Sequence, residues 1–208
     1  ACVRSVLDTI DIRIPITHTE HRYVGGDRCR DLMETCTYKH VFARFDATCL
    51  PFRDNSFDAC ISIACLHHLS TESRRVRALM EAARVVRDKG YIYVTVWRSL
   101  RRGEDENGED RFVSWQLQNC YVSEDKSRYS AHAQQMLNES STGFESSESS
   151  HVLKRYCHLF GKGELRAHIS KASKLLMQSS NKRIEILSEV LDQRNVYLSC
   201  RVCCVDRS

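Results

Sequence analysis

Glycine and proline are scarce in this sequence, with eight and two among 208 residues, and the first glycine is Gly25. This scarcity excludes a collagen-like chain and a Gly/Pro-rich low-complexity chain. No apolar run approaches the ~18 residues that a membrane-spanning helix needs. The N-terminus mixes arginine and aspartate with apolar residues, unlike a secretory signal. We therefore expect a globular chain with no membrane partner.

Cysteine, in contrast, is abundant: there are eleven, an odd number, mostly inside apolar runs such as residues 59–65. Secreted disulfide scaffolds are smaller and loop-rich, so we interpret these cysteines as reduced, buried thiols of an intracellular protein. Cys200, Cys203 and Cys204 have zinc-like spacing, but no second pair of ligands follows them. We predict a structural role for them, no metal site, and a cytoplasmic protein that can also occupy the nucleus.

The formal net charge of +4 is unevenly distributed along the chain. Residues 99–150 hold five Lys or Arg against ten Asp or Glu, whereas residues 151–208 hold eleven against five. Residues 139–150 include six Ser and three Glu, which is too polar a composition to build a core. We predict that 101–150 is an acidic, Ser-rich, mostly disordered insertion, with Phe-Val-Ser-Trp at 112–115 as an ordered island. The basic remainder favours a polyanionic partner.

Strand-like and helix-like segments alternate before this insertion. Strands are expected at 23–27, 41–45, 57–65 and 91–97, and helices at 29–37 and after residue 70. The continuous apolar run 57–65 is typical of a strand buried on both faces of a parallel sheet, so we place it at the centre of the sheet.

The helix after residue 70 has recognisable start and stop signals. Ser70 or Thr71 is expected to cap it, with Glu72 in its first turn. Its apolar stripe is expected to comprise Val76, Leu79, Met80, Ala83 and Val86. Gly90 is expected to end it in the left-handed conformation.

After the insertion we expect a helix at 161–178 and two strands at 184–191 and 196–205. The short polar turn at 192–195 predicts an antiparallel hairpin. Together these segments predict an α/β fold, a doubly wound parallel sheet closed by a C-terminal antiparallel hairpin.

Two separated blocks carry specific motifs. The first contains LPFRD (50–54), SIA (62–64), two histidines (67–68) and two arginines (74–75); the second contains RYCHLF (155–160) and GEL (163–165). In this order they resemble the S-adenosylmethionine-dependent methyltransferases that modify wobble uridines of tRNA. The resemblance extends over 23–98 and 151–204, and it is greatest to the animal tRNA methyltransferase 9-like branch and to the methyltransferase half of the AlkB-homologue fusion protein. It implies a class I, Rossmann-like methyltransferase that acts on the carboxymethyl group of the wobble uridine.

The resemblance also implies a cofactor site at the carboxyl edge of the sheet. Asp27 is expected to bind the ribose hydroxyls of S-adenosylmethionine, and Asp46 with Ala47 to contact its adenine. Ile63 and Ala64 are expected to line the cofactor. His67 is the candidate catalytic residue.

The tRNA is expected to contact the second block. Tyr156 can stack on a splayed base, while Arg155 and His158 can hold phosphate or carboxylate. Arg74 is a further candidate for RNA contact. The family often uses a small zinc-binding activator subunit, for which residues 46–52 and the strand before them are the expected contact.

Plain structural interpretations stand beside these functional ones. The two aspartates can serve turns, the histidines can pack at the start of the helix, and Arg74 can lie on a solvated helix face. The RYCHLF segment can be a strand that packs on the sheet.

The N-terminus departs from the family pattern, which has a glycine-rich loop after the first strand. Here Asp8 is followed by alternating isoleucines from Ile10 to Ile16 and by no glycine before Gly25. We therefore expect a single methyltransferase domain over 1–208 that is N-terminally incomplete and binds the cofactor weakly. The alternative function is a catalytically impaired relative that binds RNA or protein; the second block and the basic excess disfavour a small-molecule methyltransferase.

Overall fold

The computed structural model describes residues 24–28, 41–99, 108–118, 150–192 and 194–205. In chain order, the elements are β1 (Val24–Asp27), β2 (Val41–Arg44), β3 (Phe57–Ile63), η1 (Leu66–His68), α3 (Glu72–Val85), β4 (Val86–Trp97), β5 (Glu109–Gln118), β6 (Ser150–Leu159), α5 (Glu164–Ser180), β7 (Lys182–Leu191) and β8 (Asn195–Cys204). They form two compact units. We call residues 1–109 with 159–208 the core unit, and residues 110–158 the ribbon unit.

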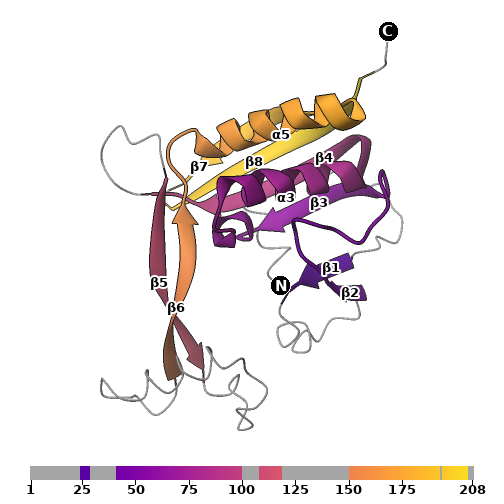
Figure 1. Ribbon diagram of the computed structural model, residues 1–208. Coiled ribbons are helices and arrows are strands. Elements are labelled where there is room, and N and C mark those ends of the chain that lie inside the picture. Colours follow the sequence, from indigo (N-terminus) through magenta and orange to yellow (C-terminus); the bar gives the residue numbers. More distant parts are fainter. Residues whose placement is uncertain (1–23, 29–40, 100–107, 119–149, 193, 206–208) are drawn as a thin grey trace. The chain divides into compact units, whose positions relative to one another are not determined.

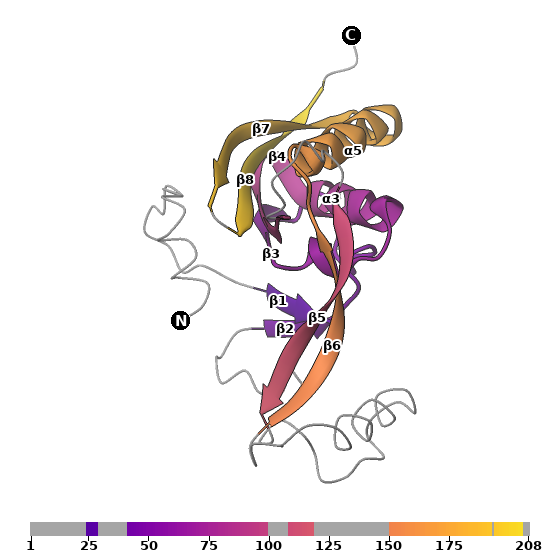
Figure 2. The same cartoon turned by 90° about the vertical axis from the view of Figure 1, so that its left-hand side faces the viewer.

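The core unit is built on a four-stranded sheet in the order β3-β4-β8-β7. β3 and β4 are parallel, whereas β8 is antiparallel to both β4 and β7. β1 and β2 form a separate parallel pair. α3 and α5 pack against each other and cover one face of the four-stranded sheet (Figures 1 and 2). The expected α/β fold and its antiparallel C-terminal hairpin are confirmed.

The position predicted for the apolar strand is wrong. Among the described strands, β3 lies at the end of the four-stranded sheet, and its residues are at most partly buried, with Ile63 36% exposed. The buried strand is β4, which lies between β3 and β8 and contacts α3. An apolar run indicates a strand of a parallel sheet, but it does not reveal how many neighbours the strand has.

α3 begins as the sequence predicts and ends differently. Thr71 is its N-cap, and the Thr71 hydroxyl accepts a hydrogen bond from the Arg74 backbone N–H (3.3 Å). The helix ends at Val85, however, and Lys89 rather than Gly90 has the positive φ, of 61°. Position 90 has no room for a side chain, because a Cβ there would lie 2.6 Å from the backbone oxygen of Asp58.

The core lies between the two helices and the sheet. Its buried apolar side chains from α3 are Val76, Ala78, Leu79, Ala82, Ala83 and Val85, and those from α5 are Leu165, Ile169, Ala172 and Leu176. Met80 is partly buried against this core, and Val86 is buried but belongs to β4. No helix in the described part of the chain is long and apolar enough to span a membrane.

The cysteines of the described residues are free thiols. Burial raises the pKa of the Cys60 thiol to about 11 and that of Cys200 to about 12. Cys200, Cys203 and Cys204 all belong to β8, where side chains alternate between faces. Cys203 therefore lies on the face of β8 opposite to that of Cys200 and Cys204, which does not suit a shared zinc ion.

The ribbon unit contains the paired strands β5 and β6. The expected island at 112–115 lies within β5. The ordered stretch is longer than that island, because β5 extends over Glu109–Gln118. Residues 101–107 and 119–149 of the predicted insertion, and the expected helix at 29–37, lie outside the described residues.

Candidate functional site

Three chain segments of the core unit end at one edge. β1 ends at Asp27, Asp46 follows β2, and Cys65 follows β3. The Phe45 backbone N–H donates to the Asp27 carbonyl (3.2 Å). Burial raises the pKa of the Cys65 thiol, and the negative charges of Asp27 and Asp46 raise it further. Asp27 and Asp46, which the resemblance assigned to the ribose and to the adenine, therefore lie near each other, at the carboxyl ends where open α/β sheets bind ligands.

Asp46 occupies a tight turn and carries a stable negative charge. Its carboxylate accepts hydrogen bonds from the Thr48 backbone N–H (2.8 Å) and hydroxyl (2.7 Å), and lies 3.6 Å from the guanidinium groups of Arg28 and Arg74. The Thr48 hydrogen bonds lower the pKa of Asp46, and the two arginines add to the effect. The turn interpretation is correct for this residue, and an ionised carboxylate is held at the edge of the sheet.

The turn after β3 holds a strained backbone beside an exposed apolar side chain. Ala64 has φ 52°, a left-handed conformation that costs energy for any residue with a Cβ. Its N–H donates to both the backbone oxygen and the side-chain hydroxyl of Thr95 (3.1 Å each), which fixes the turn. Ile63 is left partly exposed beside it, whereas Ala47, after Asp46, packs against the core.

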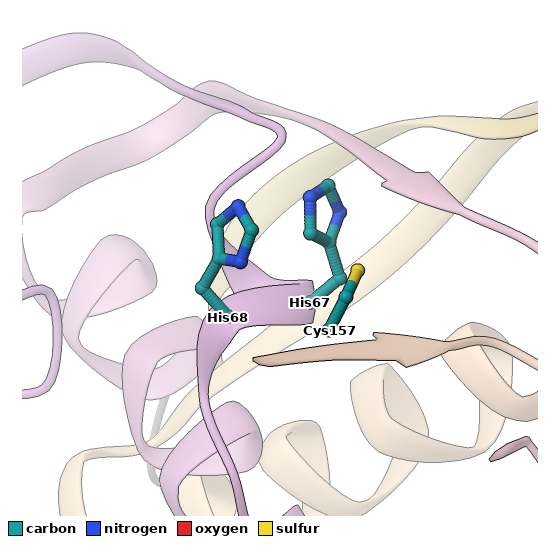
Figure 3. Close-up of side chains that lie close together, drawn as sticks. All are labelled: His67, His68 and Cys157. Carbon is teal, nitrogen blue, oxygen red and sulfur yellow. The ribbon is translucent and has the colours of Figure 1, made fainter. Parts of the chain in front are cut away.

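The two histidines of η1 differ in their surroundings (Figure 3). His67 is 0% exposed, stacks on Trp97 (centroids 4.6 Å apart), and accepts the Trp97 backbone N–H at Nδ1 (3.2 Å). An Nδ1 that accepts a hydrogen bond carries no proton, so the proton of the neutral ring is on Nε2. His68 packs edge-on against His67 and is partly exposed. The structure thus fixes the tautomer and plane of His67 through the end of β4.

The two arginines of α3 are also separated. Arg74 is partly exposed and pairs with Asp46. Arg75 is 5% exposed, donates to the Leu69 carbonyl (3.0 Å), lies 3.7 Å from the Glu164 carboxylate and covers the ring of Phe160 (5.7 Å). Arg75 therefore joins the two sequence blocks and offers little surface to an RNA.

Sequence reasoning missed the pair Glu81 and Arg84, which holds the LPFRD segment. The Arg84 guanidinium donates to the carbonyls of Leu50 and Phe52 (2.8 Å each), and the Glu81 carboxylate accepts from the Leu50 N–H (2.8 Å). The two side chains also pair with each other (2.8 Å). The available signal was an acid and an arginine three residues apart on the helix that follows the motif.

In the ribbon unit, Tyr156 and His158 share one partner that the sequence did not indicate. The Tyr156 hydroxyl donates to the Asp110 carboxylate (2.6 Å), which also binds His158 Nδ1 (2.7 Å). Phe112 packs edge-on against Tyr156. Because side chains alternate along a strand, Arg155 belongs to the opposite face. The structure therefore joins two of the three predicted residues and not the third.

Comparisons with known proteins agree with this fold. A family model described as a methyltransferase domain matches residues 14–94. Two crystal structures share the architecture: an S-adenosylmethionine-dependent methyltransferase from Clostridium acetobutylicum (TM-score 0.54, 7% identity, covering 88% of this chain and 76% of that one) and a Pyrococcus horikoshii protein (TM-score 0.51, 14% identity, covering 96% and 76%). At these identities the likeness shows the fold alone, which is the class I methyltransferase fold that the sequence predicted.

Sequence relatives are more specific. The Xenopus tropicalis tRNA (carboxymethyluridine(34)-5-O)-methyltransferase alkbh8 is 30% identical over 187 residues, covering 76% of this chain and 30% of the frog protein. The Schizosaccharomyces pombe tRNA (carboxymethyluridine(34)-5-O)-methyltransferase is 31% identical over 160 residues, covering 74% and 65%. The human probable tRNA methyltransferase 9B is 39% identical over 98 residues, covering 47% and 22%. The chain thus spans less than two thirds of the length of each of these relatives.

Proposed function

We propose that this chain, which has the class I fold and is similar to the tRNA carboxymethyluridine methyltransferases, transfers a methyl group from S-adenosylmethionine to the carboxymethyl group of a wobble uridine in tRNA. The proposal rests mainly on one observation: Asp27, Asp46 and the strained turn at Ala64 all lie at one carboxyl edge of the core unit. Parallel sheets bind nucleotide-like ligands at this edge.

The residues at the edge fit the adenosine part of this cofactor. Asp27 supplies a carboxylate that can accept hydrogen bonds from two ribose hydroxyls. The turn of Asp46 and Ala47 would contact the adenine, and the partly exposed Ile63 with Ala64 would supply an apolar wall. The carboxylates and this wall lie on neighbouring segments, which is the arrangement that a ribose with an attached base requires.

This methyl transfer needs little general acid–base catalysis from the protein. The bound cofactor supplies a methyl group already activated on a sulfonium sulfur. The acceptor, a carboxylate, is already ionised at neutral pH. The task of this chain is therefore to align the acceptor and exclude water. We propose that His67, fixed as a neutral ring against Trp97, acts as a positioning residue for the turn beside the methyl acceptor.

For the tRNA, we propose Arg74 in the core unit and Arg155, Tyr156 and His158 in the ribbon unit as contacts. An aromatic ring can stack on a splayed anticodon base, and the two arginines can hold its phosphates. We also propose a small zinc-binding activator subunit as a protein partner, bound at 46–52 and the preceding strand β2. The Glu81 and Arg84 side chains hold residues 50–52 to α3, so the backbone of this segment has a fixed conformation in which the activator subunit could bind it.

The test is methyl transfer from labelled cofactor to tRNA that carries carboxymethyluridine, with cofactor binding measured by calorimetry. Asp27→Ala should weaken cofactor binding by about 1–3 kcal/mol, since charged hydrogen-bond partners are lost. Asp58→Ala is the matched control, because Asp58 is an exposed aspartate that pairs with Arg87 at the opposite end of β3. Equal effects of the two changes would remove Asp27 from the site.

The second candidate is a catalytically impaired relative that binds RNA or protein. The absence of glycine before Gly25 favours it, because close approach of backbone to a cofactor needs glycine. This candidate predicts weak cofactor binding by the chain together with tRNA binding and no methyl transfer. Micromolar or tighter cofactor binding with turnover would reject it.

A further inference from the structure

The ribbon unit exposes an aromatic pair on one face. Phe112 is 73% exposed, more than any other large apolar side chain in the described residues. Its ring lies edge-on to Tyr156, with centroids 6.3 Å apart and planes at 78°. Residues 110 and 112 of β5 and residues 156 and 158 of β6 lie on this face, since these residues contact one another across the two strands.

The Tyr156 ring is held in place rather than left mobile. Its hydroxyl donates to Asp110 (2.6 Å), and the same carboxylate oxygen binds His158 Nδ1 (2.7 Å). A ring fixed by such hydrogen bonds loses little conformational entropy when a ligand binds on it. The exposed Phe112 therefore stands beside a pre-organised aromatic neighbour.

One exposed cation lies on the same face as this pair. Lys154 of β6 is exposed and has the same alternation as Tyr156 and His158, whereas Arg111 belongs to the opposite face of β5. The nearby carboxylates are engaged: Asp110 with Tyr156 and His158, and Glu109 with the Ser99 hydroxyl (3.1 Å). Exposed aromatics with flanking cations are the means by which proteins bind single-stranded nucleic acid, because every base offers a face for stacking.

We propose that the β5–β6 ribbon is a base-stacking surface for unpaired RNA, in which Phe112 stacks on a nucleotide of the anticodon loop. The inference rests on the proposed tRNA substrate and adds a residue to it. Phe112 provides the exposed ring, Tyr156 supports it, and Asp110 positions Tyr156. Lys154 provides a positive charge on the same face, which can meet the RNA backbone.

The experiment measures fluorescence anisotropy of a labelled anticodon stem-loop RNA with the full 208-residue chain, without cofactor. Phe112→Ala and Phe112→Leu should each weaken binding about tenfold or more, since both remove the π face. Phe112→Trp should retain the wild-type affinity. The matched control is Leu187→Ala, which shortens another exposed apolar side chain in β7.

The outcomes separate the possibilities. Wild-type RNA affinity in Phe112→Ala overturns the proposal and leaves the face to a protein partner. Wild-type affinity in Phe112→Leu overturns stacking in favour of a merely apolar contact. This assay measures RNA binding and not methyl transfer. If RNA binding depends on Phe112 but the chain transfers no methyl group, only the proposed function is refuted. Turnover with RNA binding indifferent to Phe112 would sink only this inference.

Discussion

Lys182 places a buried ammonium group at the C-terminal end of α3. Its Nζ donates to the backbone carbonyls of Ala83 (3.0 Å), Arg84 (3.0 Å) and Val86 (2.9 Å), and the residue is 5% exposed. The last carbonyls of a helix have no partners within it, and they form the negative end of its dipole. Burial lowers the pKa of Lys182, which is the cost of placing the charge there. This lysine therefore caps α3 in place of the glycine that the sequence suggested.

We expect Lys182→Met to lower the free energy of unfolding by about 2–4 kcal/mol, because the carbonyls of Ala83 and Val86 lose a buried donor and the Arg84 carbonyl keeps only the Asn55 N–H. Lys174→Met, on the exposed part of α5, is the control and should change it by less than about 0.5 kcal/mol. Urea denaturation of both variants measures the difference. Equal losses would show that the three hydrogen bonds contribute nothing net.

Single residues at the candidate site were predictable only in part. Asp27 and Asp46 could be placed from the sequence, because Asp27 ends one predicted strand, Asp46 follows another, and parallel strands share one carboxyl edge. The difference between Arg74 and Arg75 could not, since burial depends on α5, which lies far along the chain. Asp110 was hidden for the same reason: its partners belong to a strand that follows 31 residues whose composition gives no pairing signal.

The β7–β8 hairpin is closed by one carboxylate. Asp192 accepts hydrogen bonds from the backbone N–H groups of Arg194 (2.7 Å) and Asn195 (2.6 Å) and from the Tyr197 hydroxyl (2.9 Å). These bonds, that from Arg194 above all, lower the pKa of Asp192 from 3.8 to about 2. The polar turn that the sequence predicted thus has a specific closing residue.

This lowered pKa predicts how stability depends on pH. A carboxyl group whose pKa is lower in the folded than in the unfolded state stabilises the fold above its unfolded value of 3.8, and this contribution is lost as pH falls through about 2. Asp192→Asn should therefore lose less unfolding free energy than the wild type between about pH 5 and pH 2. Chemical denaturation at several pH values tests this, with Glu185→Gln on the same hairpin as control. Parallel curves for wild type and Asp192→Asn would refute it.

Strand identity was predictable and strand position was not. The apolar runs that became β2, β3, β4, β7 and β8 could be located because each is bounded by polar turns. The order of the strands in the sheet depends on which strands pair with each other, and no local sequence pattern contains that information. For this reason β3, the most continuously apolar segment before the insertion, was assigned the central position that β4 occupies.

Across the core unit, the two sequence blocks meet through a buried ion pair. Arg75 of α3 and Glu164 of α5 lie 3.7 Å apart with side chains 6% and 14% exposed, and Phe160 and His168 pack around them. The sequence showed both blocks but gave no indication that they touch. The motifs that carry the family resemblance therefore include residues that stabilise the fold, such as Arg75 and Glu164, as well as candidate site residues.

A double-mutant cycle on this pair tests whether the blocks are coupled. Arg75→Met should lower the free energy of unfolding by about 1–3 kcal/mol, because it removes the guanidinium that pairs with the partly buried Glu164 carboxylate. Arg75→Met combined with Glu164→Gln should cost less than the sum of the single changes, with a coupling of about 1–3 kcal/mol. The control cycle uses Glu72 and Lys171, which join the same two helices at 2.7 Å but are exposed, and whose coupling should stay below about 1 kcal/mol. Additive effects at Arg75 and Glu164 would mean that this ion pair does not couple the two sequence blocks.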